Sequence, residues 1–83
     1  MDLYKLNIIL QKQSNIHAFV IEVLNIFIQK QAVLLQIDSY KNTSKTCCLM
    51  MYCILSTRYA RDFVKMLRNI PAIQQLHLNR SLV

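Results

Sequence analysis

Three cysteines and two histidines are the side chains of this sequence best suited to metal binding or nucleophilic chemistry. Cys47, Cys48 and Cys53 are clustered, but they form no Cys-x-x-Cys pair, and neither His17 nor His77 stands at a zinc-ligand spacing from them. An odd number of neighbouring cysteines is not a disulfide framework. We therefore expect buried, small apolar thiols in a protein of the reducing cytoplasm, with no metal site.

Few side chains in this sequence could act as a general acid or base. The four carboxylates, Asp2, Glu22, Asp38 and Asp62, fall on different predicted elements. Neither histidine has a serine or cysteine partner on the same loop, and the cysteines have no evident electropositive activator. We expect no catalytic residues and no enzymatic site of the chain's own.

The charge is strongly basic, with a formal net charge of +6. Most of the cations are spread along the chain, but four share one face of a predicted helix: Arg58, Arg61, Lys65 and Arg68. Such a stripe is either a solvated helix face or a phosphate-binding surface. No aromatic residues interleave with it, so it offers no platform for base stacking.

Glycine is absent from all 83 residues, and proline occurs once. A P-loop, a dinucleotide-binding turn and an EF-hand all need glycine for positive φ or for close backbone approach to a ligand. Those classes of site are excluded. With 54% apolar residues the chain is too hydrophobic to be a disordered tail, and its length makes one domain, residues 1–83, with a core over about 3–80.

The hydrophobic periods define the elements that must position these side chains. Strands are predicted at residues 3–11, 32–40, 46–56 and 72–80, and helices at 16–29 and 57–69. The order βαββαβ indicates an α+β, ferredoxin-like fold. Right-handed crossovers then give a four-stranded antiparallel sheet of order 4-1-3-2 with both helices on one face. The longest apolar stretch, residues 16–28, falls short of the ~20 residues of a membrane span, so we expect no membrane partner.

Two elements carry more apolar surface than one helix layer can cover. The strand at 46–56 is apolar on both faces, which indicates burial on both. We expect Leu49, Met51 and Cys53 on the outer face of the sheet. The helix at 16–29 is apolar nearly all round, with Ile21 and Ile28 outside its core stripe. These five residues are the predicted contacts with a partner protein.

Four segments resemble one family of regulatory domains. They read LNI at 6–8, EVLNIFIQKQ at 22–31, ILSTRYARDFVKMLRNI at 54–70 and IQQLHL at 73–78. The second half has a Ser-x-Arg helix start at Ser56 and Arg58, and a leucine-bearing helix end at 67–70. Over residues 4–78 the chain resembles an ACT domain, the amino-acid-sensing regulatory module. It is most similar to the single-ACT small subunits of acetolactate synthase, in particular those of isozyme II.

The resemblance implies a non-catalytic subunit. It would bind and activate the thiamine-diphosphate-dependent catalytic large subunit in valine, leucine and isoleucine biosynthesis, and it would form a homodimer through its ACT domains. This chain would bind no cofactor itself, since thiamine diphosphate, Mg and FAD are expected on the catalytic subunit. A nucleic-acid partner is not expected.

The effector loop departs from the family pattern. Ligand-binding members have a glycine between the first strand and the first helix, and another after that helix, where Gln31 or Ala32 stands here. We therefore expect valine feedback to be lost. The positions that would hold an effector are Gln13, Ser14, Asn15 and Ile16.

Two other functions stay open at this point. One is a free-standing ACT-type amino-acid sensor that serves another enzyme. The other is a basic, ferredoxin-like nucleic-acid-binding module. An RNA-recognition domain would carry aromatic residues on the exposed faces of its first and third strands, and the first strand here offers Lys5, Asn7 and Ile9 instead.

Overall fold

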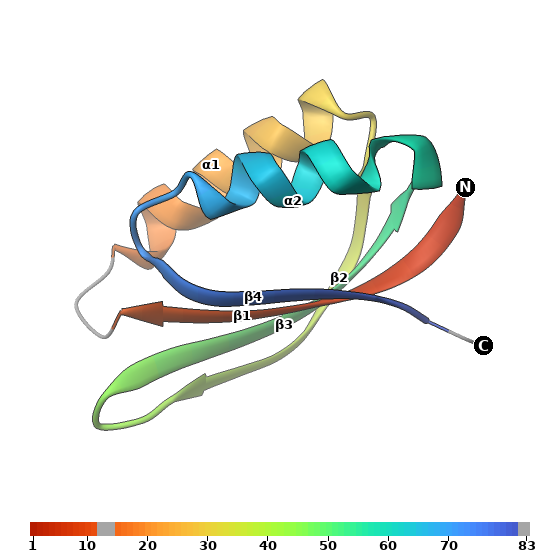
Figure 1. The fold of residues 1–83 in the computed structure, drawn as a ribbon. Coiled ribbons are helices and arrows are strands. Elements are labelled where there is room, and N and C mark those ends of the chain that lie inside the picture. The colour runs from red at the N-terminus through yellow and green to blue at the C-terminus, as the bar shows by residue number, and fades with distance from the viewer. Residues whose placement is uncertain (12–14, 82–83) are drawn as a thin grey trace.

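The computed structural model describes residues 1–11 and 15–81, and these form the predicted βαββαβ order (Figure 1). The elements are β1 (Asp2–Gln11), α1 (Ile16–Gln29), β2 (Val33–Asn42), β3 (Thr46–Leu55), the 3-10 turn η1 (Thr57–Tyr59), α2 (Ala60–Arg68) and β4 (Ile73–Arg80). The strand order β2-β3-β1-β4 is the predicted 4-1-3-2 order read from the other edge. All neighbouring strands are antiparallel, and both helices cover one face of the sheet (Figure 1). The ferredoxin-like α+β prediction is confirmed.

Local sequence explains why these elements form. β1 alternates buried and half-buried residues along its length, as its period-2 pattern predicts. In α1, Phe19, Val23 and Phe27 are buried at i, i+4 and i+8, which is one stripe of a 3.6-residue helix. The second helix is shorter than predicted, because residues 57–59 form a 3-10 turn before α2 begins.

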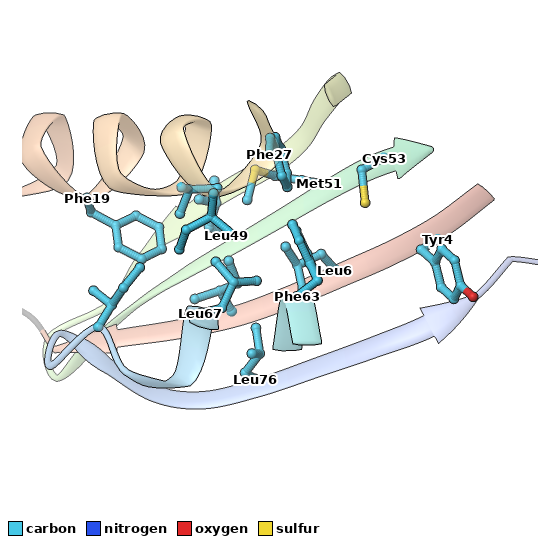
Figure 2. Close-up of a cluster of buried hydrophobic side chains, with 14 of the residues drawn as sticks. Tyr4, Leu6, Phe19, Phe27, Leu49, Met51, Cys53, Phe63, Leu67 and Leu76 are labelled. Carbon is cyan, nitrogen blue, oxygen red and sulfur yellow. The ribbon is translucent and has the colours of Figure 1, made fainter. Parts of the chain in front are cut away.

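One hydrophobic core fills the space between the sheet and the two helices (Figure 2). The rings of Phe27 and Phe63 stack at its centre, with centroids 5.1 Å apart. α2 contacts β4, whereas α1 contacts β2, so each helix covers its own half of the sheet. The largest fully buried side chains include Phe63, Leu6 and Leu67.

The predicted outer face of β3 is wrong. Leu49 and Met51 are 3% exposed and Cys53 is 0% exposed, and all three point into the core below the helices (Figure 2). The pairing register is the cause: Leu6 lies opposite Met51 and Ile8 opposite Leu49, and directly paired residues share a face. Because β1 buries Leu6 and Ile8, β3 must bury their partners. The half-buried open face of β3 is formed by Cys48, Met50, Tyr52 and Ile54.

The end of α1 is a Schellman motif without glycine. The amide of Ala32 donates to the carbonyl of Phe27 at 2.8 Å, and the amide of Gln31 donates to the carbonyl of Ile28 at 3.2 Å. Gln31 adopts φ 55°, in the left-handed region that glycine usually occupies. One of the two missing glycines of the sequence pattern is therefore replaced by a strained glutamine.

Candidate functional site

The N-terminus of α1 is the first candidate site, because the sequence places an effector there. The Asn15 side-chain oxygen accepts a hydrogen bond from the Ala18 amide at 3.2 Å, and its carbonyl accepts one from Phe19 at 3.0 Å. Asn15 is thus the N-cap of α1 and occupies an amide that an anionic ligand would otherwise bind. Ile16 packs against the core. The other two predicted effector residues, Gln13 and Ser14, lie outside the described residues.

A group of exposed apolar residues lies at the opposite side of the molecule from β4. Three residues of α1 at i, i+3 and i+7 spacing supply one flank, and the edge strand β2 supplies the other. We call this group the apolar edge; its exposed residues are Ile21, Leu24, Ile28, Val33, Leu35, Ile37 and Tyr40. Val33 lies opposite Ile54 and so belongs to the open face of the sheet, away from α1.

A crevice joins the two flanks of the apolar edge. Val20 and Leu24 line it from α1, Leu34 and Ile37 line it from β2, and core residues of β3 form its floor. Ile21 and Ile28 are 58% and 75% exposed, so the surface predicted from the sequence is present on α1. Their contact with a partner stays a prediction.

The contribution of β2 to this surface was not recognised from the sequence. The signal was available, because the predicted strand order 4-1-3-2 already makes this strand an edge. β2 is ten residues long, and no strand pairs with its outer side in residues 1–11 and 15–81. Natural proteins usually protect long edge strands, because their unpaired backbone groups can pair with another chain.

A basic groove lies at the other edge of the sheet, between α2 and β4. Arg61, Lys65 and Arg68 line its helical side, at i, i+4 and i+7. Arg58 does not join them as predicted, because it lies in the 3-10 turn, with its guanidinium 5.6 Å from the centre of the Tyr59 ring. The stripe predicted from four cations is therefore a groove lined by three.

The three cysteines are free thiols, and two of them, Cys47 and Cys53, are buried. Burial raises the pKa of the Cys53 thiol to about 11, so it is not a nucleophile at neutral pH. The buried Cys47 thiol lies between two polar groups: the Tyr40 hydroxyl donates to its sulfur at 3.7 Å, and the thiol donates to Asn42 Oδ1 at 3.4 Å. The hydrogen bond from the Tyr40 hydroxyl to the Cys47 sulfur raises the pKa of Tyr40. Desolvation of Tyr40 and the charge of Cys47 raise it further, by smaller amounts. Within the described ranges, no three His, Cys, Asp or Glu side chains gather as metal ligands.

No protein-family model and no curated protein matches this sequence. Solved structures do share its fold. The C-terminal domain of the MgtC protein from Mycobacterium tuberculosis superimposes with a TM-score of 0.78 at 11% identity, over 98% of this chain and 88% of that one. The ACT domain of GTP pyrophosphokinase from Chlorobium tepidum gives 0.69 at 10% identity, over 94% and 99% of the two chains.

A third similar structure is a putative C-terminal regulatory domain of aspartate kinase from Porphyromonas gingivalis. It has a TM-score of 0.58 at 13% identity, and the match covers 95% of this chain and 50% of that one. At these identities the likeness establishes the fold: this chain has the ferredoxin-like fold of ACT-type regulatory domains. In the part of the chain that the structure describes, no helix is long and apolar enough to cross a membrane.

Proposed function

We propose that this chain is a non-catalytic regulatory subunit, and specifically the small subunit that binds and activates the catalytic large subunit of acetolactate synthase. The observation that carries this proposal is the apolar edge on an ACT-type fold, because exposed apolar residues gathered on a small domain favour an interaction surface for another protein. The resemblance of the segments within residues 54–78 to the small subunits of acetolactate synthase supports the choice of enzyme. Thiamine diphosphate, Mg and FAD belong to the large subunit in this proposal.

A second copy of the chain is the proposed occupant of the apolar edge. Two β2 strands can pair antiparallel about a twofold axis, which extends both sheets and buries Leu35 and Ile37 of each copy. The large subunit would then contact the assembled dimer.

In this proposal the subunit supports its enzyme without sensing valine. The N-cap hydrogen bond from Ala18 to Asn15 already satisfies one of the helix amides that would receive an effector carboxylate. The missing glycine of the preceding loop removes the close backbone approach that a bound amino acid needs.

Co-expression with an acetolactate synthase large subunit tests this proposal. We expect the two chains to co-purify and the large subunit to gain activity when this chain is added. Ile28→Lys should weaken dimerisation and activation, whereas Gln29→Lys, the same charge change at an exposed position turned away from Ile21 and Ile28, should leave both intact. A mixture in which wild-type chain neither co-purifies nor activates contradicts the proposal.

A free-standing amino-acid sensor for another enzyme is the second candidate. It is favoured by two of the similar structures, the ACT domain of a GTP pyrophosphokinase and the putative regulatory domain of an aspartate kinase. Titration calorimetry with valine, isoleucine and leucine separates the two candidates. Saturable heat with one of these amino acids supports the sensor, and its absence together with activation of the large subunit supports the first proposal.

A further inference from the structure

The basic groove between α2 and β4 is lined by positively charged side chains, and the proposal above gives it no function. It is open, with a volume of about 510 Å³, and it continues past Arg68 along β4 as a second hollow of about 480 Å³. Among the described residues that line either hollow there is no carboxylate. The one acidic residue of α2, Asp62, points the other way, to Lys30 of α1 at 4.0 Å. The groove is therefore a concentrated positive surface.

The outer edge of β4 forms the second wall of this groove and presents backbone hydrogen-bonding groups. The Ser81 amide donates to the Leu3 carbonyl at 2.8 Å. In an antiparallel pair, residues that bond to the neighbouring strand alternate with residues whose amide and carbonyl point away from it, so this bond shows which residues of β4 face β1. Gln75, His77 and Asn79 therefore bond to β1, whereas Ile73 lies beyond the register shift. The amides and carbonyls of Leu76, Leu78 and Arg80 point outward, where no strand of the described ranges pairs with them.

We propose that this groove binds an extended acidic segment of a partner protein, which adds to the outer edge of β4 as a fifth strand. A residue paired with Leu78 places its side chain on the face that Leu78 occupies, which is the face of α2. Every second side chain of the added strand, about 6.8 Å apart, then faces the helix. Arg61 and Lys65, one helical turn apart, are separated by about 6 Å along the helix axis. Carboxylates at alternate positions match these cations.

The geometry favours a peptide over a nucleic acid. A nucleic acid would use the cations but has no alternating N–H and C=O groups to pair with β4. Single strands also bind through stacking on exposed aromatic side chains. Of the aromatic rings among the described residues that line the groove, Tyr4 is only 7% exposed, and His77 alternates with Leu76 and Leu78, so its ring lies on the face away from α2. This inference does not depend on which enzyme the chain regulates.

Fluorescence anisotropy with a labelled peptide of alternating threonine and glutamate tests the proposal on the full chain. We expect saturable binding that weakens with salt, and no binding of the same peptide with glutamine in place of glutamate. Backbone N-methylation of the peptide should abolish binding when it blocks the amides that face β4, and should be tolerated on the alternate set. Equal loss from both methylated sets would overturn strand addition.

Protein variants locate the site. Arg61→Gln with Lys65→Gln should weaken peptide binding about fivefold to tenfold, since each exposed ion pair accounts for up to about a fivefold change. Lys41→Gln with Lys45→Gln removes the same charge from the distant β2–β3 hairpin and should change binding less than twofold. The proposal is overturned if the peptide does not bind, if the two double variants weaken it equally, or if a labelled oligouridylate binds at the groove more tightly than the peptide.

Discussion

Phe27 of α1 and Phe63 of α2 stack face to face, with ring centroids 5.1 Å apart and 12° between the ring planes (Figure 2). Phe27 is 2% exposed and Phe63 is 0% exposed. The two helices belong to different βαβ halves of the chain, so this contact ties the halves together over the sheet. Its strength should therefore appear as an energetic coupling between two residues that are distant in sequence.

A double-mutant cycle of Phe27→Leu and Phe63→Leu measures that coupling. Leucine keeps an apolar side chain in place, so each single variant should fold, with a loss of about 1–2 kcal/mol in the free energy of unfolding. The interaction energy should be about 0.5–1.5 kcal/mol, because stacked rings are worth this much beyond their buried area. Urea denaturation followed by circular dichroism gives all four values, and additive losses would show that the stack carries no specific energy.

Gln31→Gly should stabilise the protein. Gln31 has φ 55°, a conformation that costs a residue with a Cβ about 1 kcal/mol relative to glycine. We expect a gain of about 1 kcal/mol in the free energy of unfolding, read from the urea midpoint. Gln29→Gly, two residues earlier within α1, is the matched control and should lose about 0.5–1 kcal/mol. A loss for both variants would mean that the left-handed residue is not strained.

Cys53 should make stability fall at alkaline pH. Burial raises the pKa of its thiol from 9.0 in the unfolded chain to about 11 in the fold. The stabilising effect of the neutral thiol is complete below about pH 9 and is lost as the pH rises toward 11, because the unfolded chain releases this proton first. The loss should reach up to about 2 kcal/mol.

Comparison with Cys53→Ala isolates this effect from other groups that titrate in the same range. Urea unfolding of both proteins at about pH 8 and about pH 11 should show a steeper loss for the wild-type chain. Parallel losses in the two proteins would assign the alkaline transition to other residues.

The fold could be predicted because several elements carry an unambiguous period. β1 alternates cleanly, α2 separates apolar Phe63 and Leu67 from its cations, and Pro71 ends the second helical segment. Given βαββαβ, handedness leaves one sheet order. The sequence predicted one wall of the basic groove, the charged face of α2. The second wall could not be predicted, because it depends on β4 lying at an edge of the sheet beside α2.

Which side chains of β3 point into the core could not be predicted from the sequence of that strand alone. Both of its faces are apolar, so the alternation that decides the inner face of β1 is missing. Only the register with β1 decides, and a shift of one residue reverses every side chain. The strain at Gln31 was hidden for a related reason: without a glycine, nothing in the sequence marks a left-handed residue.

Substitutions at adjacent positions of β3 test this facing directly. Met51 is 3% exposed in the core, so Met51→Lys should lose about 3–5 kcal/mol or unfold the chain, because the ammonium has no partner there. Met50 lies on the half-buried open face directly opposite the uncharged Asn7 and Ser39, where a lysine can extend into water away from its diagonal neighbours Lys5 and Lys41. Met50→Lys should therefore cost less than about 1 kcal/mol. Urea denaturation ranks the two variants, and the reverse order would mean that β3 pairs with β1 one residue out of the register described here.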